Sequence, residues 1–303
     1  NPDDPDPDVC TVDDYDCDAA LDALGPLGYA RINDATEVLA EDVDVAWSGS
    51  EFGVVWSADR TGENEIYFRR IAEDGIPVGS SIAISEQGWY YTDDSYRPRI
   101  AWAVSRWGVV WQNYCDDMGV VWWESRYATF APDGTGRMPA VPASITPSWS
   151  GAKINPDIAG TSSQFGIVFE NDNGAPHTVH FVAGGLDGTL GTYLSPFSDM
   201  MGVLRDFRYP SVASNGSLFL VVFQGKDGNV TGDPWTPIVE NYNPSGGAMD
   251  ATRLHTMSPG QNGLQPVVAF GMTDTGAGLQ WGFGIVWTLD TGTTSELWAQ
   301  VFN

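Results

Sequence analysis

The sequence has few basic residues and very few cysteines. Its 303 residues contain 14 Lys and Arg against 40 Asp and Glu, a formal net charge of −26, and only two of the basic residues are Lys. A chain this acidic repels the phosphates of nucleic acids and anionic lipid head groups, so we expect neither as a partner. No apolar run approaches the roughly 20 residues that a membrane-spanning helix needs, so we expect no transmembrane segment.

Several catalytic signatures are missing as well. The sequence contains no G-x-S-x-G motif of a serine hydrolase and no HExxH motif of a zinc peptidase. Of the three histidines, His177 and His180 lie three residues apart on a predicted strand, so they point to opposite faces and a shared metal is not expected. The sequence therefore offers few residues for serine-hydrolase or zinc chemistry.

The first 26 residues predict an acidic, extended leader. Residues 1–20 hold eight Asp and no basic residue, and proline together with like-charge repulsion keeps such a segment solvated. We interpret the leader as a tether, and we expect the protein to be secreted or held at a cell surface. A disulfide between Cys10 and Cys17 would fit export and would leave Cys115 over and buried.

Aspartates of this leader supply enough oxygen atoms for Ca²⁺, the one cofactor that the sequence suggests. The glycine and the distal Glu of an EF-hand loop are missing, and a solvated acidic arm is the simpler interpretation. The aspartates concerned are Asp13, Asp14, Asp16 and Asp18.

Past residue 40 one pattern returns five times, with starts 54 to 58 residues apart. A first apolar run, which begins with proline in four copies, is followed by a second run of the type F-G-[IV]-V-W. A third run leads into a turn such as Asp74-Gly75, whose residues tolerate positive φ, and a fourth run closes the unit. The first runs are 43–46, 98–101, 156–159, 210–213 and 266–269, and the second are 52–56, 107–111, 165–169, 219–223 and 283–287.

Five units of four β-strands predict an all-β fold, a five-bladed β-propeller over residues 27–303. The fifth unit stops at residue 303, before its fourth strand, and residues 29–33 match the missing pattern. Pairing both ends of the chain in one sheet would close the ring and leave no open inner edge. We therefore predict a last blade made from residues 263–303 plus about 28–35.

The repeated P-x-[IV]-A, [FW]-G-[IV]-V-W and D-G elements, over residues 28–303, resemble the propeller repeats of secreted and surface bacterial proteins of marine and myxobacterial type. The five-blade count is also similar to that of tachylectin-type lectins and of furanosidase-like glycoside hydrolases. The first group implies sugar binding, and the second implies hydrolysis by acids near the starts of the inner strands. A shared fold does not carry an activity across.

The longest and most unequal loops fall on the face formed by the fourth-to-first and second-to-third connections, where binding sites tend to lie. Aromatic rings beside carboxylates suit a sugar, because rings stack on its C–H face and acids bind its hydroxyls. Packing of these loops onto the blades would explain the same aromatics. The candidate ligand-binding residues are Trp89, Tyr90, Tyr91, Asp93, Asp94, Tyr96, Arg99, Trp149, Asp206 and Trp235.

The position after the repeated proline faces the central channel of the predicted ring, and two of its five residues are acids, Asp44 and Asp157. The resemblance to furanosidase-like enzymes implies catalytic acids here, with Asp44 and Asp157 or Glu170 as acid and base. The second blade departs from that pattern, because it has Arg99 in place of an acid. An ion-paired Asp–Arg–Asp belt that stabilises the channel is the alternative interpretation.

Three functions stay open. Our leading hypothesis is a secreted, non-catalytic module that recognises a glycan or another surface component through the long-loop face. The second is a glycoside hydrolase. The third is a structural or assembly subunit of a cell-surface complex, whose flat faces contact other proteins. The sequence leaves the ligand and the oligomeric state open.

Overall fold

The structure is a computed structural model. It describes residues 30–60, 62–85, 92–145, 151–174, 176–194, 205–227, 233–243, 248–254, 260–274 and 279–302. These residues form 19 β-strands, which confirms the all-β class. In this part of the chain there is no helix with the length and hydropathy needed to cross a bilayer.

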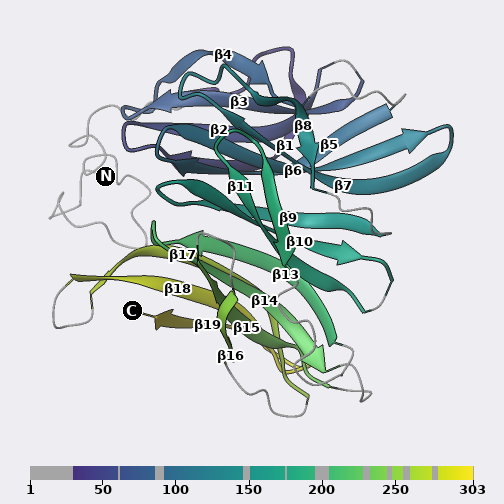
Figure 1. The fold of residues 1–303 in the computed structure, drawn as a ribbon, viewed down its shortest axis with the longest axis vertical. Coiled ribbons are helices and arrows are strands. Elements are labelled where there is room, and N and C mark those ends of the chain that lie inside the picture. Colours follow the sequence, from purple (N-terminus) through teal and green to yellow (C-terminus); the bar gives the residue numbers. More distant parts are fainter. Residues whose placement is uncertain are drawn as a thin grey trace, which may run out of the picture.

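The described strands form five antiparallel sheets in chain order, fanned from one end of the molecule to the other (Figure 1). Each sheet corresponds to one repeat unit. Sheet 1 is β1 (Val38–Trp47), β2 (Glu51–Asp59), β3 (Asn64–Ala72) and β4 (Pro77–Ala83). Sheet 2 is β5 (Thr92–Ala103), β6 (Arg106–Asp117), β7 (Val120–Phe130) and β8 (Met138–Ser144). Sheet 3 is β9 (Ala152–Gly160), β10 (Gln164–Asp172), β11 (Thr178–Gly185) and β12 (Leu190–Leu194).

Sheet 4 is β13 (Arg205–Ser214), β14 (Phe219–Asp227), β15 (Thr236–Tyr242) and β16 (Ala248–Arg253), and sheet 5 is β17 (Asn262–Asp274), β18 (Leu279–Asp290) and β19 (Ser295–Phe302). Sheet 5 therefore has three strands, and the fourth strand that we expected from about 28–35 is not among the strands described. Ile32 packs instead against sheet 1, beside Trp56 and Tyr67. The Arg69 guanidinium donates a hydrogen bond to the Ile32 carbonyl (2.5 Å), which holds this segment on sheet 1.

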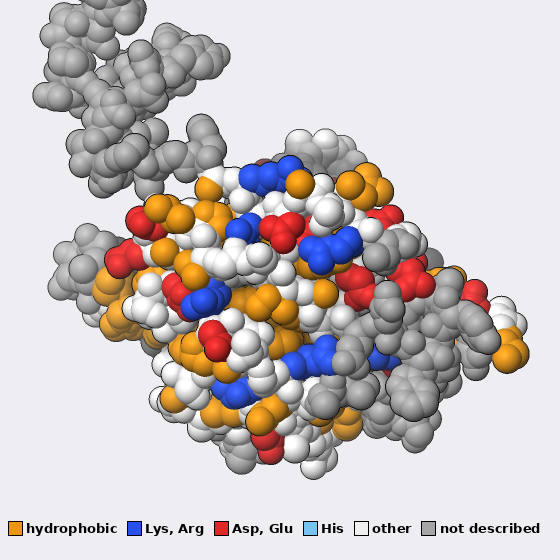
Figure 2. All heavy atoms as spheres, turned by 90° about the horizontal axis from the view of Figure 1, so that it is seen from above, with side chains coloured by type: hydrophobic (Ala, Val, Ile, Leu, Met, Phe, Trp, Pro, Cys, Tyr) orange, Lys and Arg blue, Asp and Glu red, His pale blue; other side chains and the backbone are white. Residues whose placement is uncertain are grey.

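Buried apolar clusters join each sheet to the next one along the chain. One joins sheets 1 and 2, a second joins sheets 2 and 3, a third joins sheets 3 and 4, and a fourth joins sheets 4 and 5. None of the clusters of described residues joins sheet 5 to sheet 1. The inner part of sheet 1 leaves Val45 and Trp47 exposed, and Figure 2, which looks onto this end of the molecule, shows hydrophobic side chains at the surface between charged ones.

The repeated F-G-[IV]-V-W sequence has a direct packing reason. The aromatic side chain that begins the second strand of one sheet lies over the glycine of the preceding sheet: Trp107 over Gly53, Phe165 over Gly108 and Phe219 over Gly166. A Cβ atom on Gly108 or Gly166 would lie 2.6 Å from the aromatic ring, inside van der Waals contact. Only glycine allows the sheets to approach this closely, so the repeat sets the spacing between neighbouring sheets.

This packing predicts the effect of adding one methyl group. Gly166→Ala should lower the free energy of unfolding by about 1–3 kcal/mol, because the ring of Phe219 must move out of a well-packed interface. Gly271→Ala is the matched control, since no described atom lies within 4 Å of the point where its Cβ atom would stand. Denaturant titrations of both variants measure the difference; equal stabilities would show that the ring is not held by close packing.

Candidate functional site

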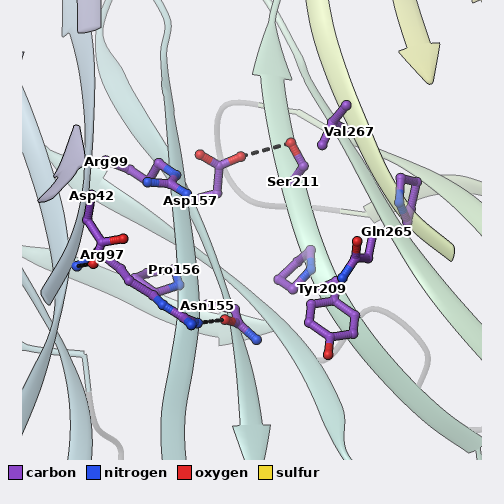
Figure 3. Close-up of a pocket in the computed structure, with 12 residues that line it drawn as sticks. Asp42, Arg97, Arg99, Asn155, Pro156, Asp157, Tyr209, Ser211, Gln265 and Val267 are labelled. Carbon is purple, nitrogen blue, oxygen red and sulfur yellow. Dashed lines mark hydrogen bonds between the residues drawn. The ribbon is translucent and has the colours of Figure 1, made fainter. Parts of the chain in front are cut away.

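The first strands of all five sheets contribute to one cavity of about 270 Å³ (Figure 3). We call this cavity the axial pocket. Each first strand supplies at least one polar side chain to it, and all five have one at the residue before the repeated proline or, in sheet 1, before Val43. These residues are Asp42, Arg97, Asn155, Tyr209 and Gln265.

A β-bulge at the same place in every sheet positions these five residues. In sheet 2, Tyr96 and Arg99 are three residues apart, but their partners Gln112 and Val110 are only two apart, so the inner strand holds one extra residue. The other four sheets show the same shift. Bulges redirect a side chain out of the regular alternation, and here the redirected side chain lines the axial pocket.

All five bulge residues adopt left-handed backbone conformations, with φ between 48° and 53°. None of them is glycine, and in four sheets a proline follows, which disfavours α-type conformations still further. Such a conformation costs on the order of 1–3 kcal/mol for each non-glycine residue. Five strained polar residues around one cavity mark the axial pocket as the candidate site.

Side chains of the preceding sheet stabilise the bulges by accepting hydrogen bonds from the backbone N–H of the bulge residue. Three of these acceptors directly follow the last aromatic residue of the F-G-[IV]-V-W motif or its variant. The pairs are Gln112 Oε1 with Asn155 N (3.0 Å), Glu170 Oε2 with Tyr209 N (3.1 Å), Gln224 Oε1 with Gln265 N (2.8 Å) and, from β1, Asp42 Oδ2 with Arg97 N (3.2 Å).

Glu170, one of the candidate catalytic acids, is buried and does not line the axial pocket. Its Oε2 atom also accepts a hydrogen bond from Asn155 Nδ2 (3.0 Å), and its Oε1 atom lies 2.5 Å from His177 Nδ1. Both carboxylate oxygens are thus engaged, Oε1 by the turn before β11 of its own sheet and Oε2 by Asn155 of that sheet and by Tyr209 of sheet 4. Glu170 therefore has a structural role, because its hydrogen bonds hold neighbouring segments of the chain together.

Asp157 lines the axial pocket near its axis. Its Oδ2 atom accepts hydrogen bonds from Ser211 Oγ (2.9 Å, Figure 3) and Val212 N (2.8 Å), and Oδ1 accepts one from Ile158 N (2.9 Å). Burial raises the pKa of Asp157 to about 6, and the hydrogen bonds from Val212 and Ser211 oppose that rise. Asp157 therefore changes charge close to neutral pH.

Asp44 has a related role between sheets 1 and 2. Its Oδ2 atom accepts a hydrogen bond from Ile100 N (2.8 Å), and burial raises its pKa. Arg99, on the strand between those of Asp44 and Asp157, favours the charged form of both acids. However, its Nη1 atom donates to the carbonyl of Pro98 (2.9 Å), and it forms no ion pair with a described carboxylate. Among the described residues the Asp–Arg–Asp belt is therefore not ion-paired, and Arg99 attracts the two acids only at longer range.

The structure disperses the predicted loop residues. Arg99 lies in the axial pocket, whereas Asp94 accepts a hydrogen bond from Asn64 N (2.8 Å) and Tyr96 packs against Trp123, with ring centroids 5.9 Å apart. The buried Asp206 binds the Arg208 guanidinium (3.1 and 3.0 Å). Outside the described residues lie Trp89, Tyr90, Tyr91, Trp149, Cys10, Cys17 and the leader aspartates Asp13, Asp14, Asp16 and Asp18; the side chain of Asp93 is not described either.

Trp235 lines a second cavity of about 360 Å³, which we call the outer pocket. It shares Tyr209 and Gln265 with the axial pocket, so the two cavities adjoin. Two cations lie close to the Trp235 ring: Lys226 Nζ at 4.7 Å and Arg208 Cζ at 5.4 Å from its centroid. An aromatic ring and two cations therefore stand next to the polar axial pocket.

Sequence reasoning named none of the five bulge residues as site residues. It took the residue after the proline as the one facing the channel, and the bulge also turns the residue before the proline toward the pocket. The available signal was the polar residue before proline in sheets 2 to 5, namely Arg97, Asn155, Tyr209 and Gln265. Among the residues that the structure describes, no group of three His, Cys, Asp or Glu side chains could hold a metal ion.

No protein-family model and no curated protein matches this chain. Solved structures resemble it in fold. A sialidase from Trypanosoma rangeli, in complex with the inhibitor DANA, is 8% identical, with a TM-score of 0.50 over 85% of this chain and 48% of that one. An endo-arabinase from Bacteroides thetaiotaomicron is 11% identical, with a TM-score of 0.48 over 91% of this chain and 98% of that one. At these identities a likeness concerns the fold alone.

The raised pKa of Asp157 predicts a pH dependence of stability. Between pH 3.8 and about 6 the folded protein keeps a proton that the unfolded chain has lost, so the free energy of unfolding falls as the pH rises through this window. Asp157→Asn should remove this contribution, of about 2–3 kcal/mol, and should gain stability over the wild type between pH 4 and pH 7. Denaturant titrations across this range test it, with Asp42→Asn, an exposed acid of the same pocket, as the control that should keep the wild-type slope.

Proposed function

We propose that the axial pocket binds one sugar unit of a glycan and that the chain is a five-bladed propeller acting as a secreted or cell-surface binding module. The observation that carries this proposal is the fivefold bulge, which brings one polar side chain from each sheet to a single cavity. A small-molecule site usually encloses roughly 300–1,000 Å³. The axial pocket, at about 270 Å³, lies just below that range and suits one ring.

The chemistry of the lining suits a sugar. Amide, phenol and hydroxyl groups from Asn155, Tyr209 and Ser211 both donate and accept hydrogen bonds, as sugar hydroxyls require. The adjoining outer pocket adds the flat ring of Trp235 on which a second sugar unit can stack. Both pockets lie toward the N-terminal ends of the inner strands, on the side where we expected the binding face.

The carboxylates favour binding over hydrolysis. Glycoside hydrolysis needs an acid and a second carboxylate on opposite sides of the scissile bond. Of the three acids that the resemblance implied, only Asp157 lines the axial pocket. All three accept a backbone hydrogen bond from the next sheet, which leaves them less available to a substrate. The second sheet supplies arginines where an acid would be needed.

A glycoside hydrolase is the second candidate function, and one observation favours it. Asp157 has a pKa of about 6, so it could act as a proton donor near neutral pH, and Asp42 is a second carboxylate in the same pocket. In this case the protein would release reducing ends from its glycan, and Asp157→Asn would abolish the release.

Binding to a glycan array, followed by calorimetry on the glycans retained, tests the proposal. Gln265→Ala should weaken binding about 5- to 30-fold, because it removes one polar contact of the pocket without changing the backbone. Ser217→Ala, in the exposed turn at the other end of β13 and β14, is the matched control and should bind as the wild type does. Recovery of the glycan intact supports a binding module; products of defined length that disappear in Asp157→Asn would establish the hydrolase instead.

A further inference from the structure

Two arginines line the axial pocket of a chain whose formal net charge is −26. Arg97 Nη1 donates a hydrogen bond to the neutral Asn155 Oδ1 (2.9 Å), and Arg99 Nη1 donates one to the Pro98 carbonyl (2.9 Å). Neither guanidinium forms an ion pair with a carboxylate in the described part of the chain. Each keeps further N–H donors and its full positive charge for a ligand.

The carboxylates of the same pocket are already engaged elsewhere. Asp42 Oδ2 accepts a hydrogen bond from the backbone N–H of Arg97, and Asp157 accepts three hydrogen bonds from Ser211, Val212 and Ile158. Burial also raises the pKa of Asp157, so this acid carries less negative charge than an exposed one near pH 6. The acids of the pocket therefore do not neutralise the arginines by direct contact.

The outer pocket adds to the positive charge. Arg208 Nη2 and Lys226 Nζ share a single carboxylate, at 3.0 and 3.9 Å from Asp206 Oδ2, so two cations stand against one anion. Three of the chain's 14 basic side chains thus line the two adjoining cavities, and a fourth, Lys226, lies beside the Trp235 ring. Acidic residues farther away are screened beyond about 8 Å at physiological ionic strength, so these local charges determine which ligand is preferred.

We infer that the sugar in the axial pocket carries an anionic group, a carboxylate or a sulfate ester, which binds Arg97 and Arg99. This inference rests on the proposed function and adds the chemical class of the ligand. A planar guanidinium fits either anion, because its N–H groups match two oxygen atoms of the same group. The neighbouring unit of the glycan then extends toward Trp235, where Arg208 and Lys226 provide further positive charge.

Calorimetry with three trisaccharides tests this inference: trigalacturonic acid, a sulfated galactan trisaccharide and the neutral galactotriose. At an ionic strength of about 0.15 M, at least one anionic sugar should bind at least about tenfold more tightly than the neutral one. Arg97→Gln and Arg99→Gln should each reduce this preference, and Arg106→Gln, at the far end of β5 and β6, is the control for loss of one positive charge. Thermal melting checks that the variants fold.

The outcomes separate the two proposals. A preference for the uronate or for the sulfated sugar supports the inference and identifies the source of the anion. Equal binding of neutral and anionic sugars overturns the inference and leaves the glycan site standing. An anion preference that survives both arginine variants also overturns it, because the anion must then bind elsewhere. Failure of all three sugars to bind, in a protein that retains no glycan on the array either, overturns both proposals.

A second inference comes from the packing of aromatic rings on glycines. In three interfaces the ring of one sheet covers the glycine of the sheet before it. In sheet 5 the equivalent glycine is Gly284, where a Cβ atom would have no described atom within 4 Å. In sheet 1 the equivalent ring is that of Phe52, which is 38% exposed whereas its counterparts Trp107 and Phe165 are completely buried. One uncovered glycine and one partly exposed ring, which contacts Trp47 of its own sheet, remain at the two ends of the series.

We propose that Phe52 packs on Gly284 of the same chain and closes the ring of sheets. The two sheets already lie close at the axis, because Asp42 of β1 and Gln265 of β17 line the same pocket. The facing surfaces are apolar on both sides: Val45 and Trp47 on sheet 1, and Val286 and Val301 on sheet 5, are all exposed by 38% or more. Closure would bury these side chains and would use the contact that the other sheets repeat.

A double-mutant cycle on the full chain tests this closure. Gly284→Ala should lower the melting temperature as much as Gly166→Ala does, and Phe52→Ala should cancel the effect of the added methyl group. If Gly284→Ala melts like Gly271→Ala in both backgrounds, the proposal fails. The coupling between the two positions could instead depend on protein concentration, and light scattering could show a dimer. That result would assign the contact to a second copy of the chain and would also overturn closure within one chain.

Discussion

The aromatic side chain that opens the second strand of one sheet rests on a glycine of the sheet before it, and much of the structure depends on this contact. This contact determines how closely neighbouring sheets approach each other at Trp107, Phe165 and Phe219. The contact recurs in three successive interfaces, and the inner strands of all five sheets converge on the axial pocket. The axial pocket exists because they converge. Sheet 4 has Leu220 in place of the glycine, and there the leucine and Phe283 belong to one buried cluster.

The repeat predicted the sheets well because each run of apolar residues returns with the same neighbours. The F-G-[IV]-V-W motif carries both a strand and its packing partner, so the five units could be placed from the sequence alone. The segment around Ile32 is not part of the repeat, so its partner could not be inferred by comparing copies. Ile32 lies between the polar residues Arg31 and Asn33 in a short run, and that pattern suits a fourth strand of sheet 5 as well as a contact with Trp56 on sheet 1; the structure has the second.

The bulges could not be located in the same way. A bulge adds one residue to every inner strand, and since all five copies contain it, comparing the copies shows no irregularity. The alternation of side chains then appears regular, and the residue before the proline is assigned away from the channel. Arg97 and Gln265 were missed for this reason. Arg99 and Asp157 were expected at the channel and line the axial pocket, because they follow the bulge and face the axis in either register.

The acids near the inner strands show why residue type alone does not define a catalytic site. An inner strand presents backbone N–H groups to its neighbour, and a buried N–H group needs an acceptor. Asp44 and Asp157 meet that need for Ile100 and Val212, and Glu170 meets it for Tyr209. A carboxylate that accepts such bonds holds two sheets together and has little capacity left for a substrate.

The arginines of the axial pocket, in contrast to its acids, keep their charge available for a ligand. Arg60 and Arg126 each lie 2.6 Å from a glutamate, as expected where carboxylates are abundant. Arg97 and Arg99 are oriented by a neutral amide and a carbonyl instead, so their position is fixed while their charge stays uncompensated at close range. Arg97 is the bulge residue of its strand and Arg99 follows two residues later, so this charge is tied to the same strained backbone that shapes the axial pocket. The feature that builds the cavity therefore also determines its charge.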